Sequence, residues 1–236
     1  MKIEVLFPEV CNLYGDLANI RYLKKSNENI EIIETKLTDE PYFLNNKPDL
    51  IYMGGMTEHS QELVINKLSI YIDRIKELID KNVYFLITGN AFEIFGKEIL
   101  NEDNSKINAL NLYDTVAKRD MMHRFNSLYV GKFNDITIVG FKSQFSHSYI
   151  DKEFTPLFNT IRSFGINKGN MNEGIKINNF MATYVIGPLL ILNPLFTKWL
   201  LKQFGIETKL AYEEEAIDAY NSRLKDYTDP NRNIYY

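Results

Sequence analysis

Short apolar runs alternate with helical patterns along the first part of this chain. Residues 3–7 predict a strand, residues 17–25 a helix, and residues 30–35 a second strand. A third apolar run, Leu50–Met53, ends at a pair of glycines. Strands that alternate with helical crossovers are typical of a parallel sheet. The pattern therefore predicts an α/β fold.

The apolar positions that follow recur with helical spacing. Val64, Leu68, Ile72, Ile75 and Ile79 are separated by four, four, three and four residues, which predicts one helix with a buried stripe. A strand over residues 83–87 then turns abruptly into a helix that ends near residue 96. A strand, a tight turn and a helix form the elbow on which some hydrolases present a nucleophile.

The pattern changes in the second half of the chain. After an exposed connection expected over residues 100–112, β-like segments lie close together, which predicts an antiparallel extension or a small second layer. These segments cover residues 127–131, 136–141, 175–177 and 182–185.

Two helices are expected near the C-terminus. Asn193 and Pro194 begin one that runs to about residue 203. The other begins with glutamates at 213–215 and ends with basic residues, charges that complement the helix dipole. We expect one domain over residues 1–205 and a helical extension over residues 206–236 packed on it.

Composition narrows the classes of function. The 236 residues are 45% hydrophobic, enough for a packed core, and the net charge of −4 with scattered Lys and Arg argues against a nucleic-acid partner. The single cysteine, Cys11, forms no internal disulfide, and the first residues lack a long apolar leader, so we expect a cytoplasmic protein. The most apolar stretch, residues 185–196, is shorter than the roughly 20 residues of a membrane span. The histidines and the cysteine show no metal-ligand spacing, and no cofactor is indicated.

Four segments resemble motifs of a known family. They are Phe7-Pro8-Glu9-Val10-Cys11-Asn12-Leu13-Tyr14-Gly15-Asp16 with Asn19 and Ile20, Met53-Gly54-Gly55-Met56 with Gln61, residues 88–96, and Ala182-Thr183-Tyr184-Val185-Ile186-Gly187-Pro188-Leu189-Leu190 with Asn193-Pro194. In the same order, they are similar to Y-P-D-L-M-N-x-Y-G-D-x-x-N-I, G-G-G-Q-D-x-x-Q, I-C-G-G-Y-Q-L-L-G and G-T-Y-L-H-G-P-L-L with N-P. Over about residues 3–205 the chain thus resembles class I glutamine amidotransferases of the cobyric-acid-synthase type, and among them the GatD-type subunits of lipid II isoglutaminyl synthases. The resemblance implies a flavodoxin-like, three-layer class I glutaminase sandwich with a mostly parallel central sheet and an antiparallel extension in the C-terminal half.

The departures from this family fall on its chemistry. In the family, a cysteine attacks the side-chain amide of glutamine and a histidine transfers the proton as ammonia leaves. Gly89 stands at the position of the cysteine and Ile186 at that of the histidine, and none of His59, His123 and His147 lies in that motif. Loss of a covalent nucleophile costs on the order of 10⁶ in turnover. The resemblance therefore implies a degenerate dyad and glutaminase activity close to background.

The resemblance also assigns residues to a vestigial pocket and to an N-terminal motif. The pocket residues are Gly54, Gly55, Asn90, Glu93 and Tyr184, and the motif residues are Tyr14, Gly15, Asp16 and Asn19.

Simpler interpretations stand beside these assignments. Gly89 could be an ordinary turn, and Gly54 with Gly55 the turn from sheet to helix. Asp16 before a helix favours an N-cap, and Glu93 near a helix start favours a surface carboxylate.

Three functional hypotheses follow. The first is a non-catalytic subunit that binds a MurT-like, Mur-ligase-like ATP-dependent synthetase in cell-wall amidation, although cobyrinate-type amidation uses the same fold. The helix from Glu213 is then a candidate partner surface, or simply an internal packing helix. The second is an active amidase that uses Cys11 with a histidine, or less plausibly the hydroxyl of Thr88 or Ser146. The third is a sensor that binds glutamine or another amino acid without turnover.

Overall fold

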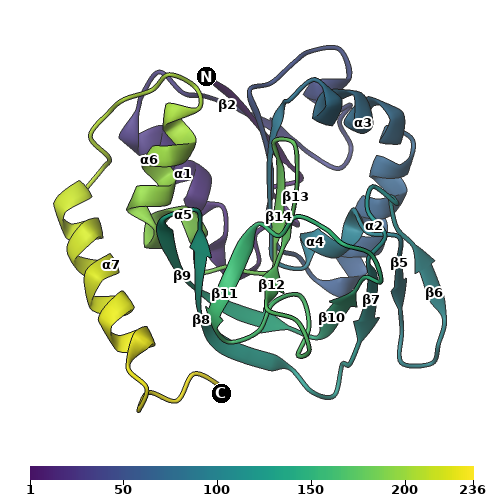
Figure 1. The fold of residues 1–236 in the computed structure, drawn as a ribbon. Coiled ribbons are helices and arrows are strands. Elements are labelled where there is room, and N and C mark those ends of the chain that lie inside the picture. The colour runs from purple at the N-terminus through teal and green to yellow at the C-terminus, as the bar shows by residue number, and fades with distance from the viewer.

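The computed structural model describes residues 1–236 and contains one large central sheet (Figure 1). The sheet consists of β1 (Lys2–Leu6), β2 (Glu31–Thr35), β3 (Leu50–Met53), β4 (Tyr84–Thr88), β13 (Ile175–Ile177) and β14 (Phe180–Thr183). Its strand order is β13-β14-β4-β3-β1-β2, and every neighbouring pair is parallel except β13 with β14 at one edge. The predicted mostly parallel sheet is confirmed. The segment near residues 182–185, expected in the antiparallel extension, lies instead inside this sheet as β14.

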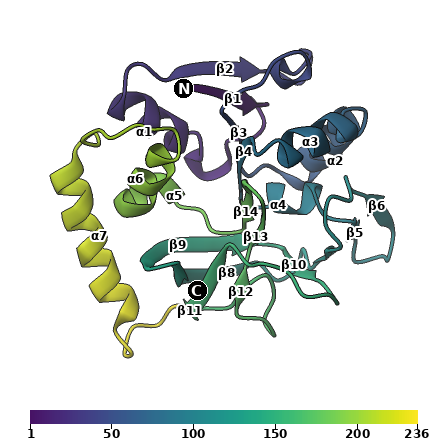
Figure 2. The same ribbon diagram turned by 45° about the horizontal axis from the view of Figure 1, so that its top comes forward.

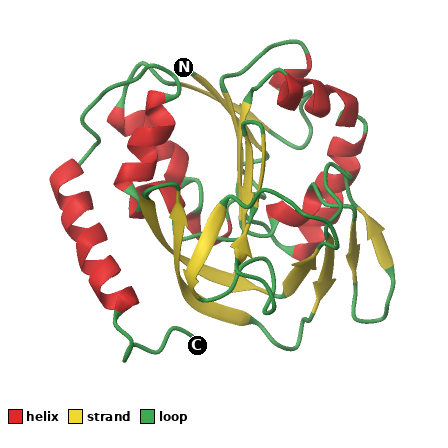
Figure 3. Ribbon diagram, viewed as in Figure 1, coloured by secondary structure: helices red, strands yellow, loops and turns green.

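Helices cover both faces of this sheet, which confirms the expected sandwich (Figures 1 and 3). One face carries α1 (Ala18–Ser26), α5 (Leu189–Leu192) and α6 (Pro194–Lys202), and the other carries α2 (Glu58–Ser69), α3 (Ile72–Asp80) and α4 (Ala91–Ile94). Each face has its own apolar core, with Leu23 and Phe196 in one and Val64 and Phe92 in the other.

The single helix predicted from the stripe of apolar residues is wrong, because the chain forms α2 and α3 with a break between them. At the break Ile70 is 73% exposed, while the ring of Tyr71 packs edge-on against Phe43 at a centroid distance of 6.1 Å. Ile72 is only partly buried. The stripe thus continues across two helices whose junction places one aromatic ring inward and one aliphatic side chain in solvent.

Two smaller sheets extend the fold below the central sheet (Figure 2). Their strands are β5 (Glu98–Leu100), β6 (Lys106–Asn108), β7 (Val116–Arg119), β8 (Phe125–Phe133), β9 (Ile136–Gln144), β10 (Ser146–Tyr149), β11 (Phe158–Arg162) and β12 (Asn172–Glu173). The strand orders are β10-β7-β5-β6 and β12-β11-β8-β9, and all pairs are antiparallel except β5 with β7. The expected antiparallel extension is confirmed. The connection over residues 100–112 is not simply exposed, because it contains β6 and the buried Leu110.

A short bridge joins the extension to the central sheet. The backbones of Phe141 and Ile186 exchange two hydrogen bonds, with N···O distances of 3.0 and 2.9 Å. The buried side chain of Asn193 adds two more bonds to the backbone of Val139, each 2.8 Å long. Strand β9 is thereby held beside the loop that follows β14.

The last helix, α7 (Glu213–Thr228), lies outermost and packs on α5, α6, β8 and β9 (Figure 1). Tyr220 is buried with Val139 and Leu192. Arg162 donates to the carbonyl oxygens of Tyr227 in the last turn of the helix and of Asp229 and Arg232 beyond it. None of the helices is both long and apolar enough to cross a lipid bilayer. The division at residue 205 remains a prediction.

Candidate functional site

The strand-turn-helix at Gly89 lies at the carboxyl end of the central sheet. β4 ends at Thr88, Gly89 adopts φ = +65°, and α4 begins at Ala91. A Cβ atom at position 89 would lie 3.1 Å from the Cα of Gly55 and 3.4 Å from Cγ2 of Ile186. Three segments that are distant in sequence therefore meet at this turn, and Gly89 and Ile186 are neighbours.

A cavity of about 130 Å³, which we call the elbow cavity, opens at this meeting point. It is lined by Leu13, Tyr14, Gly55, Thr57, Glu58, Gly89, Asn90, Arg124, Ser143, Gln144, Phe145 and Ile186. Of the five pocket residues assigned from the sequence, Gly54, Glu93 and Tyr184 do not line it, and of the N-terminal motif only Tyr14 does. They lie behind its wall.

Gly54 makes a close approach that only glycine permits. A Cβ atom there would lie 2.8 Å from the carbonyl oxygen of Cys11 and 3.0 Å from Oδ2 of Asp16. Gly15, by contrast, has φ = +72° and open space around it. Gly54 thus allows the segment after β1 to pack closely against the end of β3, whereas Gly15 only shapes a turn.

Asp16 does not cap a helix, contrary to the sequence-based expectation. Helix α1 has no side-chain cap, and Asp16 is 1% exposed beneath the turn. Its carboxylate accepts hydrogen bonds from the Thr88 hydroxyl and from Nδ2 of Asn19, the latter at 3.0 Å. Burial raises the pKa of Asp16, against the opposing effect of these bonds.

The same polar cluster ties several strand ends together. The hydroxyl of Tyr52 donates to the carbonyl oxygen of Asp16 at 2.9 Å, and Oδ1 of Asn19 accepts from the backbone N–H of Leu190 at 2.7 Å. Asp16 and Asn19 therefore connect the start of α1 to β3, β4 and α5.

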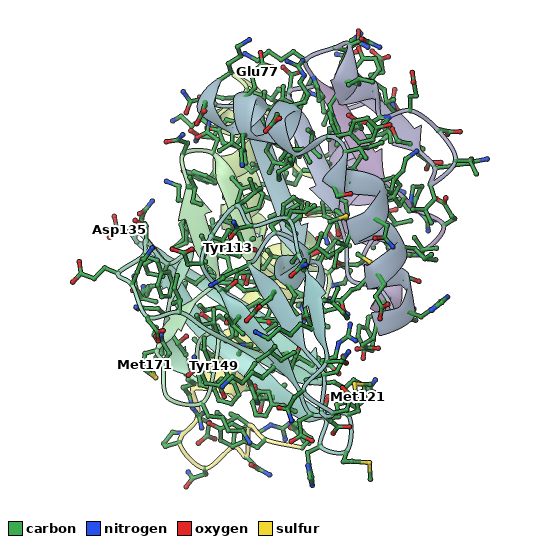
Figure 4. The ribbon with its side chains drawn as sticks, turned by 90° about the vertical axis from the view of Figure 1, so that its right-hand side faces the viewer. Glu77, Tyr113, Met121, Asp135, Tyr149 and Met171 are labelled. Atoms are coloured by element: carbon green, nitrogen blue, oxygen red, sulfur yellow. The ribbon has the colours of Figure 1, made fainter.

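Glu93 is buried rather than a surface carboxylate. It is 2% exposed, and its carboxylate accepts hydrogen bonds from Ser146, from Tyr184 at 3.1 Å and from Gln61 at 3.0 Å. Desolvation raises its pKa, while the three hydrogen bonds and the charge of Arg119 oppose that shift. Figure 4 shows the interior side chains around Tyr113, whose hydroxyl donates to the backbone of Phe92 beside this cluster.

Asn90 binds the loop that follows β3. Its Oδ1 accepts from the backbone N–H of Met56 at 2.9 Å, and its Nδ2 donates to the carbonyl oxygen of Met56 at 2.8 Å. Its own carbonyl oxygen accepts from Nε2 of Gln61 at 2.7 Å.

No alternative nucleophile reaches the elbow cavity. Cys11 is fully buried, its Sγ lies 4.0 Å from Sδ of Met56, and burial raises the pKa of its thiol far above the ordinary range. His147 packs on Phe164, and burial lowers its pKa to about 4. The amidase that uses Cys11 with a histidine thus lacks support, because Cys11 has no imidazole among its partners.

The hydroxyls of Thr88 and Ser146 are equally unavailable. Both side chains are buried, and both donate to buried carboxylates, Thr88 to Asp16 and Ser146 to Glu93. Neither residue lines the elbow cavity.

Three polar residues of the cavity wall were not anticipated from the sequence. Arg124 lies just before β8 with its guanidinium 4.5 Å from the ring centroid of Phe145, and Ser143 accepts or donates a 3.0 Å hydrogen bond with the hydroxyl of Tyr14. Gln144 is 4% exposed, and its Oε1 has no hydrogen-bond partner. All three come from the antiparallel extension, where no motif marks them.

The geometry supplies a cavity without an activated nucleophile. It contains backbone and polar side chains suited to hold a small polar molecule, and the hydroxyls on its wall, those of Tyr14, Thr57 and Ser143, have no imidazole or carboxylate among their hydrogen-bond partners. No group of three or more His, Cys, Asp or Glu side chains is placed to hold a metal ion.

Comparisons with known proteins agree with this architecture. The pattern of the CobB/CobQ-like glutamine amidotransferase domain matches residues 2–192. The lipid II isoglutaminyl synthase (glutamine-hydrolyzing) subunit GatD of Staphylococcus aureus (strain N315) is 26% identical over 211 residues, 88% of this chain and 85% of that protein.

Two solved structures share the fold at 11% sequence identity. A glutamine amidotransferase from Thermotoga maritima aligns with a TM-score of 0.52 over 94% of this chain and 92% of that chain. Another glutamine amidotransferase gives 0.54 over 86% of this chain and 99% of that chain.

Proposed function

The chain belongs to the CobB/CobQ-like glutamine amidotransferase family, and we propose that it is a non-catalytic subunit which binds an ATP-dependent synthetase. The synthetase would be MurT-like, act in the cytoplasm and amidate a cell-wall precursor. The similarity to a lipid II isoglutaminyl synthase subunit favours this pathway over cobyrinate-type amidation.

One observation carries the proposal. A side chain at position 89 would contact both Gly55 and Ile186, so the former nucleophile and base positions face each other across the elbow cavity. Gly89 has only a hydrogen atom as its side chain, and Ile186 has a hydrocarbon. Because neither can form a thioester or transfer a proton, glutamine bound there would keep its amide.

Without the nucleophile this subunit would release no ammonia, so the synthetase would need another source of nitrogen. Free ammonia, or a second amidotransferase, would supply it. The subunit would then act by binding and shaping the synthetase, and the exposed faces of α7 are a candidate contact surface.

The proposal is tested by purifying the tagged chain from its native cells and assaying the complex. We expect a Mur-ligase-like synthetase in stoichiometric amount, and amidation driven by ammonium chloride but not by glutamine. Ammonia release from glutamine above background would refute the loss of activity. The Cys11→Ala variant is the matched control, since any activity that depends on that thiol disappears with it.

A second candidate function is amino-acid binding without turnover. The buried Oε1 of Gln144 lacks a partner on the cavity wall, and Arg124 and Glu58 place opposite charges there. These two charges match the carboxylate and the ammonium group of an amino acid.

Thermal unfolding with glutamine or glutamate tests this second candidate. Ligand at 100 times its Kd would stabilise the protein by about 2.7 kcal/mol. Arg124→Ala should abolish the shift, and Arg21→Ala, a change at an exposed residue on α1, should not. No shift in the unchanged protein would exclude the sensor and leave the scaffold.

A further inference from the structure

The loop Gly54-Gly55-Met56 lies unusually close to the turn at Gly89. A Cβ atom at position 89 would meet the Cα of Gly55 at 3.1 Å, tighter than nearly all real Cβ contacts, and the N of Gly55 at 3.5 Å. The nearest obstacle is backbone rather than the end of a flexible side chain. The loop itself would have to move to admit a side chain there.

Asn90 holds the loop in this position. Its side chain makes both hydrogen bonds that the Met56 backbone offers, at 2.9 and 2.8 Å. Nε2 of Gln61 donates to the carbonyl oxygen of Asn90 at 2.7 Å, and Oε1 of Gln61 accepts from the guanidinium of Arg119 at 2.8 Å. The two hydrogen bonds between Asn90 and Met56, which we call the clamp, are therefore anchored in the protein interior.

The clamp also uses a backbone N–H next to the cavity wall. An elbow that performs acyl transfer needs backbone N–H groups free to face the developing oxyanion, and loss of one donor costs roughly 10²–10³ in turnover. The N–H of Met56, next to Gly55 on the cavity wall, already donates to Asn90.

We propose that Asn90 is a positioning residue that closes the Gly54-Gly55-Met56 loop onto the elbow, so that a side chain at position 89 must push against the loop backbone. The closure adds a second barrier to the missing dyad. Restoring a cysteine and a histidine at positions 89 and 186 would leave the site closed until Asn90 is also changed. The proposal builds on the proposed loss of glutaminase activity, but its test measures loop closure rather than ammonia, so each can fail alone.

A cysteine probe at the elbow tests the closure. Cys11 is the sole natural cysteine and is fully buried, so iodoacetamide labelling of folded Gly89→Cys protein reports position 89. We expect the labelling rate to rise at least tenfold when Asn90→Ala is added. Asn46→Ala, which removes an amide hydrogen bond to the Tyr42 carbonyl oxygen outside the elbow cavity, should change the rate less than twofold.

A stability cycle gives a second readout where the cysteine variant fails to fold. Gly89→Ala should lower the urea midpoint more in the unchanged protein than in the Asn90→Ala background, because the loop can then retreat. Equal shifts in the two backgrounds overturn the proposal. So does a labelling rate that Asn90→Ala leaves within twofold, or that Asn46→Ala raises as much as Asn90→Ala does.

Discussion

The close approach of Gly54 to the β1 loop allows a direct test of how the site is built. In Gly54→Ala the new methyl group would lie 2.8 Å from the Cys11 carbonyl oxygen, short of the ordinary 3.4 Å by about 0.6 Å. Overpacking of this kind costs about 1–3 kcal/mol. The other neighbour is Asp16, at 3.0 Å, and its retreat would strain its bonds to Thr88 and Asn19. A weakened bond to a charged group adds about 1.5–3 kcal/mol. We expect a total loss of about 2.5–6 kcal/mol.

Gly15→Ala is the matched control, since its added methyl group meets nothing within 4 Å. Only its left-handed backbone opposes the change, at a cost of roughly 1–2 kcal/mol. Urea unfolding followed by the fluorescence of Trp199, the only tryptophan, gives both free energies. If Gly54→Ala is no more destabilising than Gly15→Ala, the close approach of Gly54 to the segment after β1 does not define the packing of the site.

Three further predictions concern buried groups. Cys11 should react with Ellman's reagent only as fast as the protein unfolds, and rapid labelling of the native protein would contradict its burial. Burial raises the pKa of Glu93, so its contribution to stability is full below the unfolded value of about 4.3 and is lost as pH rises through the raised folded value. From pH 4 to 8 the unfolding free energy of the unchanged protein should therefore fall relative to that of Glu93→Gln. A difference between the two that does not depend on pH would show that the pKa of Glu93 does not change on folding. Asn193→Ala leaves the buried N–H and C=O of Val139 unpaired and should cost about 2–5 kcal/mol, whereas the exposed Asn231→Ala should stay within about 0.5 kcal/mol when both are measured in urea.

The central sheet was predictable because its strands are buried on both faces. Leu50–Met53 is buried at every position, and such a run reads as a strand without any partner being known. The antiparallel extension was less visible, since its strands carry buried polar residues. Lys142 and Glu173 are both fully buried and joined by a 2.6 Å ion pair, an arrangement that a hydrophobicity pattern does not detect.

The residues of the candidate site also divide into those that the sequence predicted and those that it did not. The motifs marked Gly89 and Ile186, and these two positions are neighbours in the structure. Asp16 and Glu93 were given surface roles, because the burial of a polar residue depends on partners elsewhere in the chain. Thr88, a partner of Asp16, lies 72 residues away. Arg124 and Gln144 enter the site only through strand pairing, which a single sequence does not specify.

The polar residues of the site separate into two groups that bear differently on function. Asp16 and Asn19 bond to each other, to β3 and β4 and to α5, so the fold alone accounts for them, and their presence requires no glutaminase activity. Gln144 is different, because its buried Oε1 has no partner and so weakens the fold that contains it. Structure does not account for that atom. If Gln144→Leu raises stability without affecting the purified complex, the cavity is a remnant and the scaffold suffices. If the change instead abolishes stabilisation by an amino acid, the pocket has kept a ligand after losing its chemistry.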